Sequence, residues 1–143
     1  MAKEAIEAKG LKYVEVTVTN TNDVQQATQS IVSQCDAIYI PTDNTFAASM
    51  PVVHGVVVES KTPVICGEGG MVTSGGLATL GINYYDLGYQ TGLMAVKIIK
   101  GEAKPATMPI QGSVNFDYVI NGDVAEELGI AIPADLQQYI VKK

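Results

Sequence analysis

Short, almost wholly apolar segments alternate with helix-length segments along this chain of 143 residues. The clearest apolar segments are 37–40 and 63–66, and runs of this kind indicate strands that are covered on both faces. Short strands that alternate with helices are typical of α/β proteins. We therefore expect an α/β fold with a mainly parallel sheet that is covered by helices on both faces.

The remaining segments continue this alternation. Polar and β-branched residues alternate at 13–18, which predicts a half-buried strand. Further extended segments are expected at 77–82 and 111–120. Helices are expected at 2–9, 23–34, 45–60, 85–100 and 124–128, with a glycine-rich loop at 67–76, a connector at 101–109 and a polar tail from Pro133.

The charge balance argues against nucleic acid as a partner. The chain has 15 Asp and Glu residues against 9 basic residues, all of them Lys, and its formal net charge is −6. Nucleic-acid binders carry a basic patch and use Arg for bidentate phosphate contacts.

No run of the sequence approaches the roughly 20 apolar residues of a membrane span. Residues 1–10 predict a short helix in place of a signal peptide, so the chain as written is expected to be soluble and to carry no signal segment.

The two cysteines, Cys35 and Cys66, stand in no metal-binding or redox spacing. Each lies beside an expected strand, and free cysteines are among the most buried residues in proteins. We expect two buried free thiols, with a disulfide as the alternative. A chain of this length buries enough surface to fold without a disulfide or a metal.

Polar side chains follow three of the expected strands. In open α/β sheets, ligands bind beyond the carboxyl ends of the strands, and the expected topology brings these side chains to one edge of the sheet. The candidate binding residues are Asp43, Asn44, Thr45, Glu68, and Tyr84 or Tyr85.

Each candidate also has a purely structural interpretation. Asp43, Asn44 and Thr45 are residue types that cap helices, Glu68 suits a solvated loop, and the tyrosines suit a core. Capping and binding are compatible, because a helix N-terminus attracts anions. The single histidine, His54, lies among valines on an expected helix and is assigned no role.

Enzyme motifs fail on inspection. Segment 70–75 has the glycine spacing of a P-loop, but the Lys and the Ser or Thr that must follow are missing. The dinucleotide fingerprint breaks at Val72, and Ser74 lacks the glycine that a nucleophile elbow needs. We therefore expect a binding module with no catalytic residue, cofactor or metal. The alternatives are a small α/β enzyme that uses Asp43 and Glu68, or a fragment that folds without a ligand.

Four stretches of the chain resemble one family. They are CDAIYIPTDNT at 35–45, GGLATLGINYYDLGYQTG at 75–92, IKGEAKPATMP at 99–109 and LGIAIP at 128–133. They are similar to the substrate-binding proteins of ABC transporters, in the subfamily of tryptophan- and other aromatic-amino-acid-type binders. The similarity extends from about residue 2 to residue 140.

The resemblance implies the type I periplasmic-binding fold, in which two lobes close on a ligand without catalysis. It implies an extracytoplasmic protein, periplasmic or a membrane-anchored lipoprotein, that delivers its solute to a membrane permease. Carboxylates would hold an ammonium group, loop amides and hydroxyls a carboxylate, and tyrosine rings an aromatic side chain, so an amino-acid-like ligand is expected. Carried over by position, the site comprises Asp43, Asn44, Thr45, Glu68, Gly69, Asn83, Tyr84 and Tyr85.

The resemblance covers only the second half of the family's proteins. It implies that residues 1–143 form a single α/β domain equivalent to the C-terminal lobe, without the first lobe, its anchor and the strand that precedes residues 2–9. Residues 83–110 are then an excursion that packs on the other lobe in full-length relatives. Its apolar side chains need a cover, so we expect a homodimer or an exchange of strands between chains. The resemblance implies that this lobe is a three-layer, flavodoxin-like domain. The alternative to a dimer is local repacking into a compact, flavodoxin-like monomer.

Overall fold

The computed structural model describes residues 2–142, which form five strands, six α-helices and two short 3-10 helices. The strands are β1 (Ile38–Ile40), β2 (Val64–Cys66), β3 (Ala78–Ile82), β4 (Phe116–Asn121) and β5 (Ile140–Val141). The helices are α1 (Ala2–Ala8), η1 (Thr21–Asp23), α2 (Val24–Ile31), α3 (Asn44–Ser60), α4 (Gly69–Thr73), α5 (Tyr84–Ile99), α6 (Gly122–Leu128) and η2 (Ala134–Tyr139).

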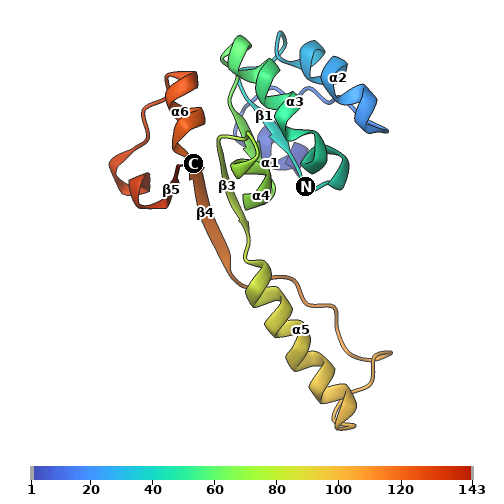
Figure 1. Cartoon of the computed structure of the whole chain (residues 1–143). Coiled ribbons are helices and arrows are strands. Elements are labelled where there is room, and N and C mark those ends of the chain that lie inside the picture. Colours follow the sequence, from blue (N-terminus) through green and yellow to red (C-terminus); the bar gives the residue numbers. More distant parts are fainter. Residues whose placement is uncertain (1, 143) are drawn as a thin grey trace.

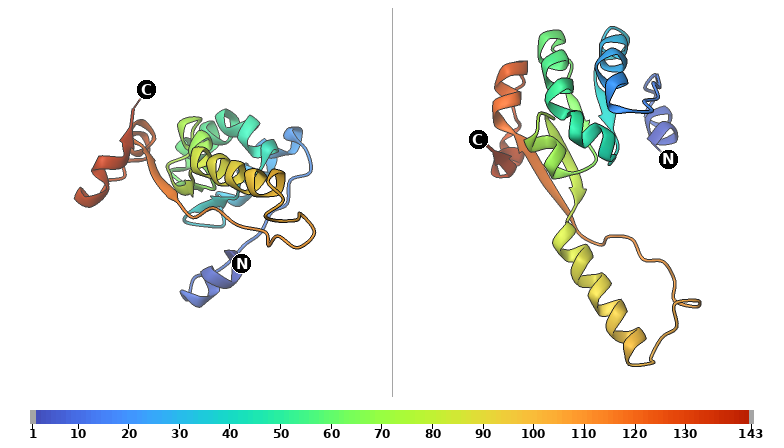
Figure 2. Two further views of the ribbon diagram at one scale, coloured as in Figure 1. Left: turned by 90° about the horizontal axis from the view of Figure 1, so that it is seen from below. Right: turned by 45° about the vertical axis from the view of Figure 1, so that its right-hand side comes forward.

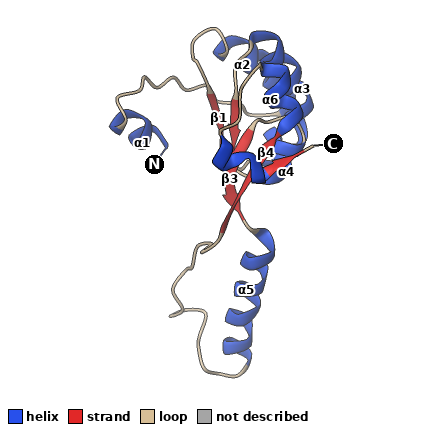
Figure 3. Ribbon diagram, turned by 90° about the vertical axis from the view of Figure 1, so that its left-hand side faces the viewer, coloured by secondary structure: helices blue, strands red, loops and turns tan. Residues whose placement is uncertain are grey.

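The strands form one sheet in the order β1-β2-β3-β4-β5. Neighbouring strands are parallel except at β3 and β4, which pair antiparallel with Leu80 opposite Tyr118. Figure 1 shows the twisted sheet with its helices, and Figure 3 shows α1 on the opposite side of the sheet from α2 and α3. The predicted α/β fold with a mostly parallel sheet is confirmed.

The main core lies between the sheet and helices α2, α3 and α4. Met50 and Val53 of α3 and Val24 of α2 are each 0% exposed and pack against Ile38 and Ile40 of β1. The side chains that alternate with these along the strands point to the other face and stay exposed. They are Tyr39, Ile65, Leu80 and Tyr118.

Two glycines allow the close approaches that this core needs. A Cβ atom at Gly76 would lie 2.2 Å from the Sγ of Cys66, and one at Gly67 would lie 2.4 Å from the backbone nitrogen of Thr42. Neither distance is compatible with a side chain. Gly76 therefore fits the end of α4 against β2, and Gly67 fits the loop after β2 against the loop after β1.

Helix α5 leaves the body of the molecule. Figures 1 and 2 show it projecting beyond the end of β3, with a long loop returning to β4. None of its residues is buried, and large apolar side chains on it and on the returning loop are open to solvent. Tyr85 is 82% exposed, Ile99 84% and Ile110 101%.

The prediction of a strand at 13–18 is wrong in one respect. The segment is extended, but it belongs to no sheet, because no strand among residues 2–142 pairs with it. The alternating sequence thus produced the backbone conformation without the pairing.

Three further boundaries differ from the sequence prediction. The glycine-rich loop at 67–76 contains the helix α4, and only 116–120 of the extended segment 111–120 enter the sheet. The polar tail from Pro133 forms η2 and then β5, which pairs with β4. Short segments of this kind are stabilised by tertiary neighbours, which local sequence patterns do not report.

Candidate functional site

The candidate site lies at the edge where β1, β2 and β3 end. These strands are parallel neighbours, so the loops that follow their carboxyl ends meet at that edge. The loops also touch. Gly67, after β2, contacts Thr42, after β1, and a Cβ at Gly81, near the end of β3, would lie 3.0 Å from the Cα of Glu68. The structure therefore brings together the loop after β1, the loop after β2 and the end of β3.

Three of the predicted site residues are helix N-caps. Asp43 accepts a 3.0 Å hydrogen bond from the backbone N–H of Phe46 at the start of α3. Glu68 accepts from two backbone N–H groups of α4, each at 2.7 Å. Asn83 accepts from the N–H of Asp86 at 2.9 Å and starts α5. The capping interpretation is confirmed for Asp43, and Glu68 is a cap as well, not a loop acid without contacts.

A cavity of about 230 Å³ opens at this edge, between the start of α4 and the strands β3 and β4. Three predicted residues line it, namely Glu68, Gly69 and Tyr84. Its other lining residues are Gly70, Thr79, Gly81, Ile82, Asp117 and Val119. The structure thus gathers carboxylate, hydroxyl and aromatic groups from four elements around one space.

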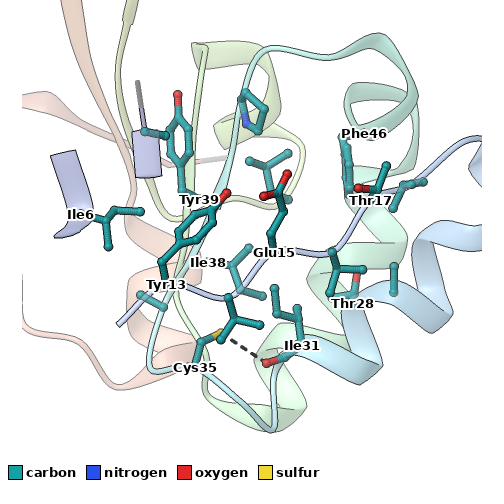
Figure 4. A pocket seen from close by; sticks show the side chains of 18 of the residues that line it. Ile6, Tyr13, Glu15, Thr17, Thr28, Ile31, Cys35, Ile38, Tyr39 and Phe46 are labelled. Atoms are coloured by element: carbon teal, nitrogen blue, oxygen red, sulfur yellow. Dashed lines mark hydrogen bonds between the residues drawn. The ribbon is translucent and has the colours of Figure 1, made fainter. Parts of the chain in front are cut away.

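The other predicted residues lie around this cavity without lining it. Asn83 is next to it, because its amide donates to Asp117. Asp43 lines a different cavity beside β1 (Figure 4), and Asn44 and Thr45 line neither of these two cavities. Tyr85 is 82% exposed and is not a core aromatic.

Two lining residues were missed by the sequence analysis. Thr79 is 3% exposed, and its Oγ1 has no hydrogen-bond partner among the described residues. Asp117 enters from β4, where antiparallel pairing sets it opposite Gly81. The extended segment predicted at 77–82 includes Thr79, but no local signal reports the β3–β4 register that brings Asp117 to the site.

The side chains around the cavity are chemically complementary to a small ligand with polar and aromatic groups. Carboxylate oxygens of Asp117 and Glu68 are able to accept hydrogen bonds from a cationic group, and a hydroxyl such as that of Thr79 can both donate and accept. An unpaired buried hydroxyl costs free energy that a ligand's polar atom can recover. The ring of Tyr84, 54% exposed, offers an apolar face with a polar tip.

The cysteines and the histidine have structural contacts. Both cysteines are free, and Cys66 is 2% exposed. Burial, with a smaller contribution from the charge of Glu68, raises the pKa of the Cys66 thiol to about 12. The Nε2 of His54 lies 2.7 Å from the Oε2 of Glu127 and joins α3 to α6, and His54 does not line the cavity at the edge of the sheet.

Two negative findings concern residues 2–142. Within them, no group of three or more His, Cys, Asp or Glu side chains is arranged to hold a metal ion. None of the helices that the structure describes is long and apolar enough to cross a bilayer.

Comparison with known proteins relates this chain to one family. The family described as "ABC transporter substrate binding protein" matches residues 1–142. The chain is 37% identical over 130 residues to a tyrosine-binding protein of Clostridioides difficile (strain R20291), covering 90% of this chain and 37% of that protein.

Solved structures agree with this match. A domain from Streptococcus pneumonia in complex with L-Trp has a TM-score of 0.85 at 37% identity. A ligand-free, open substrate-binding protein with adhesive properties from Clostridium difficile has a TM-score of 0.74 at 42% identity. The matches cover 98% and 99% of this chain and 47% of each of those chains, so the chain spans about half the length of these relatives.

Proposed function

Because the chain belongs to the ABC transporter substrate-binding protein family, we propose that it is a solute-binding lobe for an aromatic amino acid resembling tyrosine or tryptophan. In this role it is not catalytic. It acts outside the cytoplasm and passes its ligand to a membrane permease. Support comes from the tyrosine-binding relative and from the neighbour that holds L-Trp.

The observation that carries the proposal is the cavity at the edge of the sheet. Asp117 and Glu68 face the ligand's ammonium group, and the buried Thr79 hydroxyl pairs with a second polar atom of the ligand. The Tyr84 ring packs on the aromatic side chain. Gly69 leaves room for the ligand at the start of α4, and the rim is completed by Asp43, Asn44, Thr45, Asn83 and Tyr85.

The apolar side chains exposed on α5 and on the loop that follows it need a partner surface. Helix α5 and residues 110–118 expose Tyr89, Leu93, Ile110 and Val114, and exposed large apolar side chains in this number are typical of an interaction site. In the proposed arrangement, residues 83–110 pack on a second lobe, as in full-length relatives, or on a second copy of this chain. With one wall of the cleft, the single chain binds its ligand weakly.

A thermal-shift screen across the amino acids tests the binding. A ligand that binds only the folded state raises the melting temperature by mass action, so L-tyrosine and L-tryptophan should raise it at millimolar concentration while L-alanine should not. Equal, zero shifts for all amino acids would contradict the proposal, and so would turnover of an added amino acid. Light scattering measures the mass of the assembly. A mass of 15.1 kDa, that of one chain, at all protein concentrations would exclude packing of residues 83–110 on a second copy of this chain.

A further inference from the structure

One asparagine of this chain is followed directly by glycine. Among all the asparagines of the sequence, only Asn121 has this neighbour, Gly122. Asparagine loses its side-chain amide most readily in this context, because glycine has no side chain to hinder attack by its own backbone nitrogen. The pair lies where β4 passes into α6, and Asn121 is 7% exposed. The asparagine with the most reactive neighbour is therefore buried at a junction of two elements.

The side-chain amide of Asn121 is held by two hydrogen bonds. Its Nδ2 donates to the C=O of Val72 at 3.0 Å, and its Oδ1 accepts from the N–H of Val124 at 3.2 Å. The first bond ties β4 to α4, and the second caps α6. The amide is thus a link between two helices, and its chemical conversion changes the packing at this point.

The backbone of Asn121 is held in a conformation that cannot react. Attack on the side chain requires the Gly122 nitrogen and the Cβ of Asn121 on the same side of the Cα–C bond, which corresponds to a negative ψ. The ψ of Asn121 is 105°, and its backbone N–H donates to the C=O of Leu77 at 2.8 Å. The junction must therefore open before the amide can be lost.

Strand β5 packs directly on Gly122. A Cβ at Gly122 would lie 2.7 Å from the Cγ2 of Ile140 and 3.0 Å from the Cε of Lys142, and Asn121 pairs with Val141 in the parallel β4–β5 ladder. The strand has only two residues and lies at the end of the sheet. Short peripheral elements of this kind open at a lower free energy than the core does, so β5 is the element whose opening frees the pair.

We propose that Asn121–Gly122 is a deamidation site and that β5 controls its reaction by holding the pair in the unreactive conformation. The backbone nitrogen of Gly122 forms a bond to the Cγ of Asn121, and the bond from Cγ to Nδ2 breaks. The amide nitrogen leaves as ammonia with the proton that Gly122 loses. Water then opens the resulting cyclic imide at one of its two carbonyl groups, which gives aspartate or isoaspartate at position 121.

Both products destabilise the junction. An aspartate at this position still accepts from the Val124 N–H, but it has no donor for the Val72 carbonyl, so a carboxylate and a carbonyl oxygen face each other where both are buried. Isoaspartate adds a methylene group to the backbone and displaces β4 against β5. Asn121→Asp, which carries the side chain of the first product, should therefore melt at a lower temperature than the parent. An equal melting temperature would contradict the structural role of the amide.

Peptide mass mapping, with labelling by an isoaspartate methyltransferase, measures the reaction at every asparagine. In the chain unfolded by urea at pH 8, we expect Asn121 to react first. In the folded chain it should react at least about a hundredfold more slowly, because only the small open fraction of molecules reacts. Urea far below the unfolding midpoint should leave the folded rate nearly constant, since opening of β5 exposes little surface.

Three results of that experiment would overturn the proposal. The first is another asparagine that reacts first in the unfolded chain, and the second is an equal rate in the folded and the unfolded chain. The third is a folded rate that rises with urea as steeply as the unfolded fraction does, because it would make global unfolding the route to the reaction.

A pair of variants tests the control by β5. Ile140→Ala removes the side chain that covers Gly122 and should raise the folded rate about tenfold, the order of the packing lost with a half-buried isoleucine. Ile99→Ala makes the same truncation on α5, where the side chain is 84% exposed, and should leave the rate unchanged. Lys142→Ala is a milder change against Gly122 and should raise the rate even if Ile140→Ala does not fold. Rates in the β5 variants equal to that of Ile99→Ala would overturn the proposal.

Discussion

The Nδ2 of Asn83 donates a 2.8 Å hydrogen bond to the Oδ2 of Asp117. This bond joins the end of β3, where the chain leaves the body of the molecule, to β4, where it returns. It also holds the carboxylate of Asp117 at the cavity that Glu68 and Tyr84 line. The excursion of α5 is thus anchored at its base by the same side chain that we place in the ligand site.

Replacement of Asp117 should weaken ligand binding more than it weakens the fold. Asp117→Ala removes a charge-assisted acceptor, which is worth about 1.5–3 kcal/mol, or roughly a tenfold to hundredfold loss of affinity. Asp117→Asn keeps an acceptor for Asn83 but loses the charge and should show a similar loss for L-tyrosine. Titration calorimetry measures both, and the exposed Asp135→Ala serves as the control. Unchanged affinity in both Asp117 variants would remove this residue from the site.

Thr79 offers a second test of the cavity. Thr79→Val keeps the shape of the side chain and removes its unpaired hydroxyl. Without ligand, the variant should be as stable as the parent or more stable, because a buried polar atom without a partner is removed. With ligand, its thermal shift should be smaller than that of the parent. A loss of stability in the free protein would show that the hydroxyl already has a partner.

The cap of α3 contributes to stability through Asp43. Asp43→Ala should lower the free energy of unfolding by about 1 kcal/mol, because the N–H of Phe46 loses its acceptor. Asp43→Ser restores the cap and should recover most of that loss. Urea denaturation of the three proteins measures the difference, and equal stability of the Ala and Ser variants would mean that the cap contributes nothing.

Two glycine replacements should have opposite signs. Gly76→Ala forces a Cβ to within 2.2 Å of the Cys66 Sγ, and overpacking of this kind costs about 1–3 kcal/mol. Gly55→Ala lies in the interior of α3 with no atom within 4 Å of the new Cβ, so it should stabilise by about 0.5–1 kcal/mol. Melting temperatures of the two variants should therefore move in opposite directions. A neutral Gly76→Ala would contradict the close contact of α4 with β2.

The raised pKa of Cys66 predicts a pH dependence of stability. The folded protein favours the neutral thiol, so this contribution is fully present below the ordinary thiol pKa of 9.0 and is lost as the pH rises toward about 12. The slope of unfolding free energy between pH 9 and 11 should be steeper in the parent than in Cys66→Ala. At pH 8 a thiol reagent should modify Cys35 first and Cys66 only on unfolding.

Sequence reasoning reached the elements that carry strong local signals. The apolar runs predicted β1 and β2. The residue types at 43–45 indicated a helix cap, and the structure assigns that cap to Asp43. What it missed depends on neighbours far along the chain. Asp117 reaches the site only through the antiparallel β3–β4 register. Segment 13–18 has the sequence of a strand, but no strand that the structure describes pairs with it.

The most direct test of the proposed ligand site is a map of backbone amide shifts in the chain titrated with L-tyrosine. We expect saturable shifts centred on Gly69, Thr79, Tyr84 and Asp117, with smaller changes at Asp43 and none at the exposed end of α5 near Ile99. Shifts centred elsewhere, or no shifts at saturating L-tyrosine and L-tryptophan, would contradict the claim that this edge of the sheet binds an aromatic amino acid.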